Sequence, residues 1–105
     1  MKLSELNPRW SGLPGPIYDG VTFDCPHCRI AGLSGDSCQR IGVTFTPPID
    51  PDGWWSRISQ PTYAGRLLWH REGDTFETLT LTPSVNTRID AKGHWHGFIK
   101  NGEVT

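Results

Sequence analysis

The sequence predicts a small, mainly β fold of antiparallel strands, with many loops and little or no helix. Two observations carry this prediction. Short segments alternate between apolar and polar residues, whereas no window keeps a helical period over three turns. The 105 residues also include 12 glycines and 9 prolines, which interrupt helices and central strands.

The length of the chain fits a single domain, residues 1–105. Only 35% of the residues are hydrophobic, so we expect a small core. Five tryptophans and four phenylalanines compensate in part, because each buried aromatic ring removes a large area from water. A domain with so small a core usually needs a metal ion or a disulfide to stabilise it.

The first half of the chain contains two predicted strands. Residues 1–20 are rich in turn formers, and we expect an irregular N-terminal arm there. The alternation in Val21–Asp24 predicts a short half-buried strand. A glycine-rich loop is expected over 31–37. Residues 41–46 then show the clearest period of two in the chain.

The middle of the chain predicts a loop and three strands. Three prolines within 47–53 favour a loop. Strands are expected over 54–58, 66–70 and 75–82, with a hairpin turn at 71–74 between the last two.

The end of the chain predicts a loop followed by a hairpin. Pro83 should end the preceding strand, and 84–93 reads as a polar loop. Asn101-Gly102 between 94–100 and 103–105 is the strongest short hairpin signal in the sequence.

Charge and hydropathy argue against several classes of partner. The net charge is −1, and no basic run is present to track a nucleic-acid backbone. No apolar stretch is long enough to span a membrane, and residues 1–10 lack the apolar segment of a signal peptide. We therefore expect a cytoplasmic protein with no membrane partner, and we do not expect nucleic acid to be its ligand.

The Cys25-Pro-His-Cys28 motif supplies two candidate metal ligands. The count of three cysteines is odd, and in a reducing cytoplasm a close pair is more often metal-binding or catalytic than disulfide-bonded. A redox role would require a helix that starts at the motif within a βαβ unit, and the glycine-rich sequence after Arg29 is a poor helix former.

His94-Trp-His96 supplies the second candidate pair of ligands. Side chains two residues apart on a strand point to the same face, so both imidazoles can reach one ion. Two thiolates and two imidazoles in a tetrahedron match Zn²⁺. Because the two pairs lie far apart in sequence, a zinc ion held by Cys25, Cys28, His94 and His96 would link distant segments of the fold.

Two other residues are weaker candidates for the same site. His27 lies between the cysteines and could compete as a ligand. Cys38 is expected to be a small half-buried residue, and it is the best substitute if one histidine is not a ligand.

Three segments of the chain carry a resemblance to a known family. They are Cys25–Cys28, Gly73–Val85, and His94–Ile99 followed by Asn101-Gly102. In these segments the chain resembles a family of small proteins of unknown function, encoded by tailed bacteriophages and some bacteria, and the resemblance extends from about Leu3 to Val104. In the family pattern a cysteine often precedes the Trp-His pair, and here His94 is the nearest candidate.

The resemblance implies a phage or prophage origin, and hence a host cytoplasm. Many members carry the automated label ammonia monooxygenase. That activity is not expected here, because a membrane-bound copper oxygenase needs membrane spans and because the cysteine pair suits zinc better than copper.

Three functions fit these observations. The first is a zinc-stabilised accessory domain that binds another protein, in antagonism of host defence or in phage assembly. Its contact patch would include Trp54-Trp55 with Trp10 and Tyr18, unless these rings belong to the core. The second is a zinc hydrolase in which His94 is not a ligand, water completes the shell, and Glu77 or Asp74 acts as general base. The third is a zinc-ribbon-like nucleic-acid binder.

Overall fold

The computed structural model describes residues 1–13, 17–30, 32, 40–57, 67–86 and 96–105. Within these residues, seven strands form one sheet in the order β1 to β7, so each strand pairs with its neighbours in sequence. Every pair is antiparallel except β3–β4, which is parallel. The mainly β fold with little helix is therefore confirmed. Among the described residues, no helix is long and apolar enough to cross a membrane.

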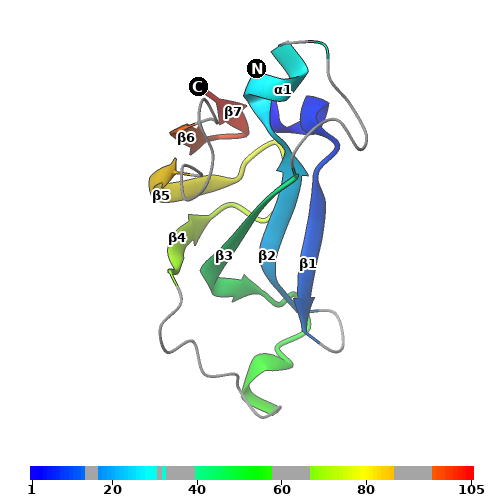
Figure 1. Cartoon of the computed structure of the whole chain (residues 1–105). Coiled ribbons are helices and arrows are strands. Elements are labelled where there is room, and N and C mark those ends of the chain that lie inside the picture. Colours follow the sequence, from blue (N-terminus) through cyan, green and yellow to red (C-terminus); the bar gives the residue numbers. More distant parts are fainter. Residues whose placement is uncertain (14–16, 31, 33–39, 58–66, 87–95) are drawn as a thin grey trace.

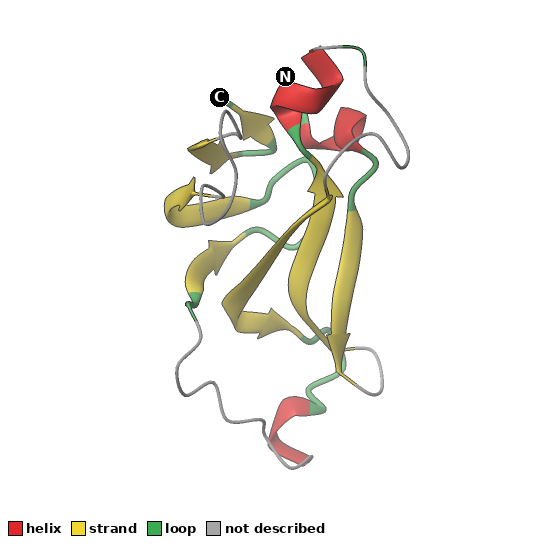
Figure 2. Cartoon of the chain, in the orientation of Figure 1, coloured by secondary structure: helices red, strands yellow, loops and turns green. Residues whose placement is uncertain are grey.

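Figure 1 shows β1, β2 and the long β3 side by side, with β4 to β7 following one another on the other side of the molecule. The helical segments lie at the two ends of the molecule (Figure 2). The elements are η1 (Leu3–Leu6), β1 (Arg9–Leu13), β2 (Ile17–Asp24), α1 (Pro26–Ile30), β3 (Arg40–Ile49), η3 (Trp55–Arg57), β4 (Trp69–Glu72), β5 (Thr80–Asn86), β6 (His96–Lys100) and β7 (Glu103–Val104).

The N-terminal segment links the last strand of the sheet to the first. Lys2 forms a bridge with Glu103, and the Leu3 amide donates to the Gly102 carbonyl at 2.7 Å. The chain then passes through η1 into β1, so the sheet curls around its core. The predicted irregular arm over 1–20 is therefore wrong for its described residues, which include η1, β1 and the start of β2, and residues 14–16 lie outside the described part of the chain.

The interior of the curled sheet is one cluster of buried side chains. Trp10 packs against this cluster, with its ring stacked on Phe76 at 4.4 Å and edge-on to Phe45 at 6.1 Å between centroids. Trp10 is therefore part of the core and not of an exposed patch. The largest fully buried side chains are Phe23, Phe45, Leu3, Leu6, Ile17, Leu79 and Ile99.

β3 continues through Pro47 and Pro48 to Ile49, so the loop predicted from residue 47 begins too early. Arg71 of β4 supplies hydrogen-bond donors to the carbonyl groups at this end of the strand. Its guanidinium donates to the carbonyls of Pro47 (2.8 Å) and Pro48 (3.2 Å), and it also bonds the Gly73 carbonyl. Burial lowers the pKa of Arg71, and the nearby Asp74 carboxylate opposes this shift.

The strand predicted over 54–58 is also wrong, because residues 55–57 form the helical turn η3. The Asp50 carboxylate accepts the backbone N–H groups of Trp54 (2.9 Å) and Trp55 (2.7 Å). Such side-chain bonds to the backbone favour a helical turn over a strand.

The hairpin predicted in the middle of the chain exists, but it is shifted toward the C-terminus. β4 lies where a strand was predicted over 66–70, and β5 lies where one was predicted over 75–82. Residues 73–79 connect them, whereas the predicted turn was 71–74. Pro83 does not end β5. It lies where the pairing of β5 with β6 is irregular, so the sheet does not require a hydrogen bond from its nitrogen atom.

The C-terminal hairpin is confirmed. Asn101 and Gly102 adopt left-handed conformations, with φ of 48° and 73°, between β6 and β7. Both values suit the type I′ turn that asparagine and glycine favour.

Gly102→Ala is expected to reduce the free energy of unfolding by about 3 kcal/mol, because a Cβ atom adds backbone strain and a clash. That atom would lie 2.6 Å from the Phe76 carbonyl oxygen and 2.7 Å from that of Glu77. Urea unfolding of both proteins measures the difference.

Gly53→Ala is the matched control, since Gly53 also has a positive φ (70°) but a Cβ atom added there would have no neighbouring atom within 4 Å. We expect a loss of about 1 kcal/mol there, from strain alone. Equal losses in the two variants would show that the close approach at Gly102 does not matter.

Candidate functional site

The two cysteines of the motif lie one helical turn apart at the start of α1. The Cys25 carbonyl accepts the Arg29 amide at 3.1 Å, and Pro26 occupies the first helical position, which proline favours. α1 has only five residues and ends at Ile30, as expected from the poor helix-forming sequence after Arg29.

Both cysteine side chains are buried in the core cluster. Cys25 is fully buried and Cys28 is 9% exposed, and neither forms a disulfide. Residues three apart around a helical turn lie on the same side, which suits the prediction that both cysteines bind one ion. The zinc ligation of Cys25 and Cys28 itself stays a prediction.

The described structure does not bring His96 to the cysteines. Its side chain is exposed on β6, and its Nε2 atom lies 3.0 Å from the Ser84 hydroxyl of β5. Among the described residues, no three His, Cys, Asp or Glu side chains form a group that could hold a metal ion. His94 and Cys38 lie outside the described residues, so the second half of the ligand set stays a prediction.

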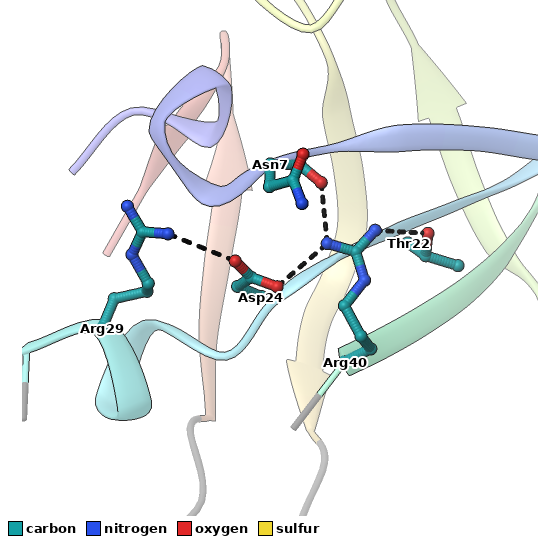
Figure 3. Close-up of polar contacts among 5 residues, drawn as sticks. All are labelled: Asn7, Thr22, Asp24, Arg29 and Arg40. Atoms are coloured by element: carbon teal, nitrogen blue, oxygen red, sulfur yellow. Dashed lines mark hydrogen bonds and ion pairs between the residues drawn. The ribbon is translucent and has the colours of Figure 1, made fainter. Parts of the chain in front are cut away.

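Asp24 is the carboxylate next to the cysteine pair in sequence, and both of its oxygen atoms are engaged (Figure 3). Oδ2 binds Arg29 at 3.3 Å, which ties β2 to α1, and Oδ1 binds Arg40 of β3 at 3.0 Å. Arg40 also donates to the Asn7 carbonyl (2.7 Å) and the Thr22 hydroxyl (2.8 Å). This cluster positions the start of α1 against two strands and the N-terminal segment, and no pattern in the sequence indicated it.

The two carboxylates considered as general bases are both exposed. Asp74 and Glu77 lie in the connection between β4 and β5, and neither joins the cysteines in a metal-binding group within the described chain. The described geometry thus offers no free carboxylate beside Cys25 and Cys28, because Asp24 is held by two arginines.

Asp24→Asn is expected to lower the free energy of unfolding by about 1–3 kcal/mol and to leave the zinc content unchanged. Its carboxylate is 9% exposed, whereas the two arginines are about one-third exposed, so solvent screens part of the loss. Urea unfolding and metal analysis test this, with the exposed Asp52→Asn as control. Loss of zinc in Asp24→Asn would contradict the positioning role.

A second feature that sequence reasoning missed is a groove on the outer face of β5, β6 and β7. Its volume is about 660 Å³, and Phe98 in it is 59% exposed. The sequence of 96–100 could have indicated this exposed ring, because a strand that buries Ile99 must turn Phe98 outward.

Comparison with known proteins gives one partial match. A segment of 60 residues, 55% of this chain, is 33% identical to the methionine–tRNA ligases of two Bacteroides fragilis strains. The chain spans about 9% of the length of these curated relatives. No protein-family profile and no solved structure matches the chain.

Proposed function

We propose that this protein is a non-enzymatic accessory domain of phage or prophage origin, stabilised by one zinc ion, which binds another protein. The proposed zinc ligands are Cys25 and Cys28 with His94 and His96, and the ion links α1 to the C-terminal hairpin. This ligation requires the His96 ring to leave the Ser84 hydroxyl, which lies 3.0 Å from its Nε2 atom in the structure. The observation that carries the proposal is the burial of both cysteines within the hydrophobic core. Burial of these two residues supports a structural site, which is filled by four protein ligands, whereas a catalytic site keeps a position open to water and substrate.

The surroundings of the cysteine pair favour this function over a zinc hydrolase. A hydrolase needs a carboxylate or imidazole free to move a proton beside the metal-bound water. Asp24, the carboxylate next to the motif in sequence, is instead engaged in structural ion pairs with Arg29 and Arg40.

X-ray absorption at the zinc edge of the purified protein tests the proposed site. We expect two sulfur ligands at about 2.3 Å and two nitrogen ligands at about 2.0–2.1 Å. Three protein ligands with one oxygen would instead support the hydrolase, and the absence of zinc would refute both functions.

A further inference from the structure

The turn between β6 and β7 contains the only Asn-Gly pair in the sequence, Asn101-Gly102. In such a pair the glycine nitrogen can attack the side-chain carbonyl carbon of the asparagine, because glycine has no side chain to crowd the approach. The other asparagines precede Pro8, which has no N–H group, and the β-branched Thr87. Asn101 is therefore the asparagine of this chain with the highest intrinsic tendency to deamidate.

Deamidation of Asn101 consumes water and releases ammonia. The Gly102 nitrogen loses its proton and forms a bond to Cγ of Asn101, the Cγ–Nδ2 bond breaks, and ammonia leaves with that proton. Water then opens the resulting cyclic imide at one of its carbonyl carbons. Opening at Cγ gives aspartate, whereas opening at the backbone carbon gives isoaspartate, in which the main chain runs through Cβ and Cγ.

The fold engages the nitrogen atom that would attack. The Gly102 amide donates to the Leu79 carbonyl at 2.9 Å, and Gly102 is buried although Asn101 is exposed. To react, this nitrogen must give up its hydrogen bond, lose its proton and turn toward the Asn101 side chain. Breaking the hydrogen bond of a buried amide costs free energy, so the reaction is slower in the folded chain than in an open one.

Other parts of the fold hold the peptide groups on both sides of this nitrogen. The Asn101 amide donates to the Thr80 hydroxyl at 2.9 Å, and the Gly102 carbonyl accepts the Leu3 amide at 2.7 Å. A Cβ atom added to Gly102 would lie 2.6 Å from the Phe76 carbonyl oxygen, so the turn lies tightly against its neighbours. The backbone of the turn therefore has little freedom to rotate while the chain is folded.

We infer that Asn101 is a deamidation site which the folded hairpin protects, and that its isoaspartate product prevents the chain from refolding. Isoaspartate adds one atom to the backbone. This atom shifts the peptide groups that Leu3 and Leu79 bind, and it disturbs the register of β6 with β7. Chains that stay open are thereby removed from the folded population, whereas folded chains keep Asn101. Neither step depends on the proposed zinc ion or on a partner protein.

Incubation of the purified protein in mildly alkaline buffer, with and without urea, tests the protection. Trypsin cleaves after Lys100 and releases residues 101–105, and liquid chromatography with mass spectrometry separates the Asn, Asp and isoaspartate forms of this peptide. We expect deamidation to be at least about tenfold slower in the folded protein than in urea, because it requires the turn to open. Equal rates in buffer and in urea would overturn the protection.

Thr80→Val tests whether the contacts of the turn provide the protection, since it removes the acceptor of the Asn101 amide. Deamidation of this variant in buffer should be about threefold faster than that of the parent, as expected for one lost hydrogen bond. Its rate in urea should equal that of the parent, and circular dichroism should show that it is folded. A folded Thr80→Val protein that deamidates no faster than the parent would overturn the role of these contacts.

Removal of urea after partial deamidation tests the effect on refolding. Size-exclusion chromatography separates folded from unfolded chains, and we expect isoaspartate in the unfolded fraction but Asn and Asp in the folded one. Asn101→Asp is the matched control, because it has the charge of the product without the extra backbone atom, and Asp-Gly also favours this turn. It should refold as the parent does. Isoaspartate in equal proportion in both fractions, or an Asn101→Asp protein that does not refold, would overturn the role of the extra backbone atom.

Discussion

Cys28→Ser is expected to leave the chain largely unfolded at room temperature. We do not expect a folded domain that has only lost an activity. A serine hydroxyl is a poor substitute for a thiolate, and the free energy of binding a structural zinc ion, about 10–16 kcal/mol in small zinc domains, is also folding free energy. The free energy of unfolding of most domains is only about 5–15 kcal/mol, so losing the zinc-binding free energy is enough to unfold the chain. Circular dichroism and amide chemical-shift dispersion in NMR spectra measure it.

The same substitution at the third cysteine provides the control. Cys38→Ser should keep one zinc ion per chain and change the free energy of unfolding by about 1 kcal/mol or less, as expected for a small half-buried residue. A well-folded Cys28→Ser protein with native chemical-shift dispersion would contradict the zinc-stabilised fold. Loss of zinc in Cys38→Ser would assign Cys38 to the ligand set.

Phe45→Ala is expected to reduce the free energy of unfolding by about 3–5 kcal/mol. Phe45 is fully buried on β3, and its ring contacts both sides of the curled sheet. Trp10 of β1 packs edge-on against it at 6.1 Å, and the Arg71 guanidinium of β4 lies 5.6 Å from its centroid. The alanine variant leaves a cavity that these two larger side chains cannot fill without moving.

Phe98→Ala is the matched control for this loss, since it removes the same ring from the outer face of β6. We expect a change of less than about 0.5 kcal/mol, because the ring is already 59% exposed and its removal creates no cavity. Urea unfolding of the two variants measures both losses. Similar losses would mean that Phe98 packs as a core residue, and the groove would then lose its exposed aromatic centre.

Local sequence patterns predicted a strand correctly where the alternation within that strand, or the turn next to it, determines the structure. The start of β3 and the β6–β7 hairpin were predicted correctly for this reason, since Asn101-Gly102 alone favours the left-handed turn. The N-terminal arm was predicted wrongly because its glycines at 12 and 20 lie within the β1–β2 pairing, and because Lys2 pairs with Glu103 at the opposite end of the chain. No local pattern in 1–20 indicates that pairing.

Hydrogen bonds from side chains to the backbone explain two other wrong predictions. The prolines at 47–48 can lie in a strand because Arg71 binds their carbonyl groups from β4. Residues 55–57 form a helical turn because the Asp50 carboxylate binds two backbone N–H groups. Period-two patterns contain no information about either contact.

The candidate metal site was predictable in part. The spacing of Cys25 and Cys28 keeps the two residues close along the chain, and the structure buries both at the start of α1, whereas their zinc ligation stays a prediction. The Asp24 cluster could not be predicted, because Arg40 reaches it from another strand. The ligation by His94 and His96 stays a prediction, with His96 located beside Ser84 on the outer face.

Metal analysis of the purified protein, with thermal unfolding before and after treatment with a strong chelator, tests the central claim most directly. The account predicts one zinc ion per chain and loss of the cooperative unfolding transition when the ion is removed, with recovery when zinc is returned. A protein that contains no zinc and unfolds at the same temperature in the chelator would contradict it.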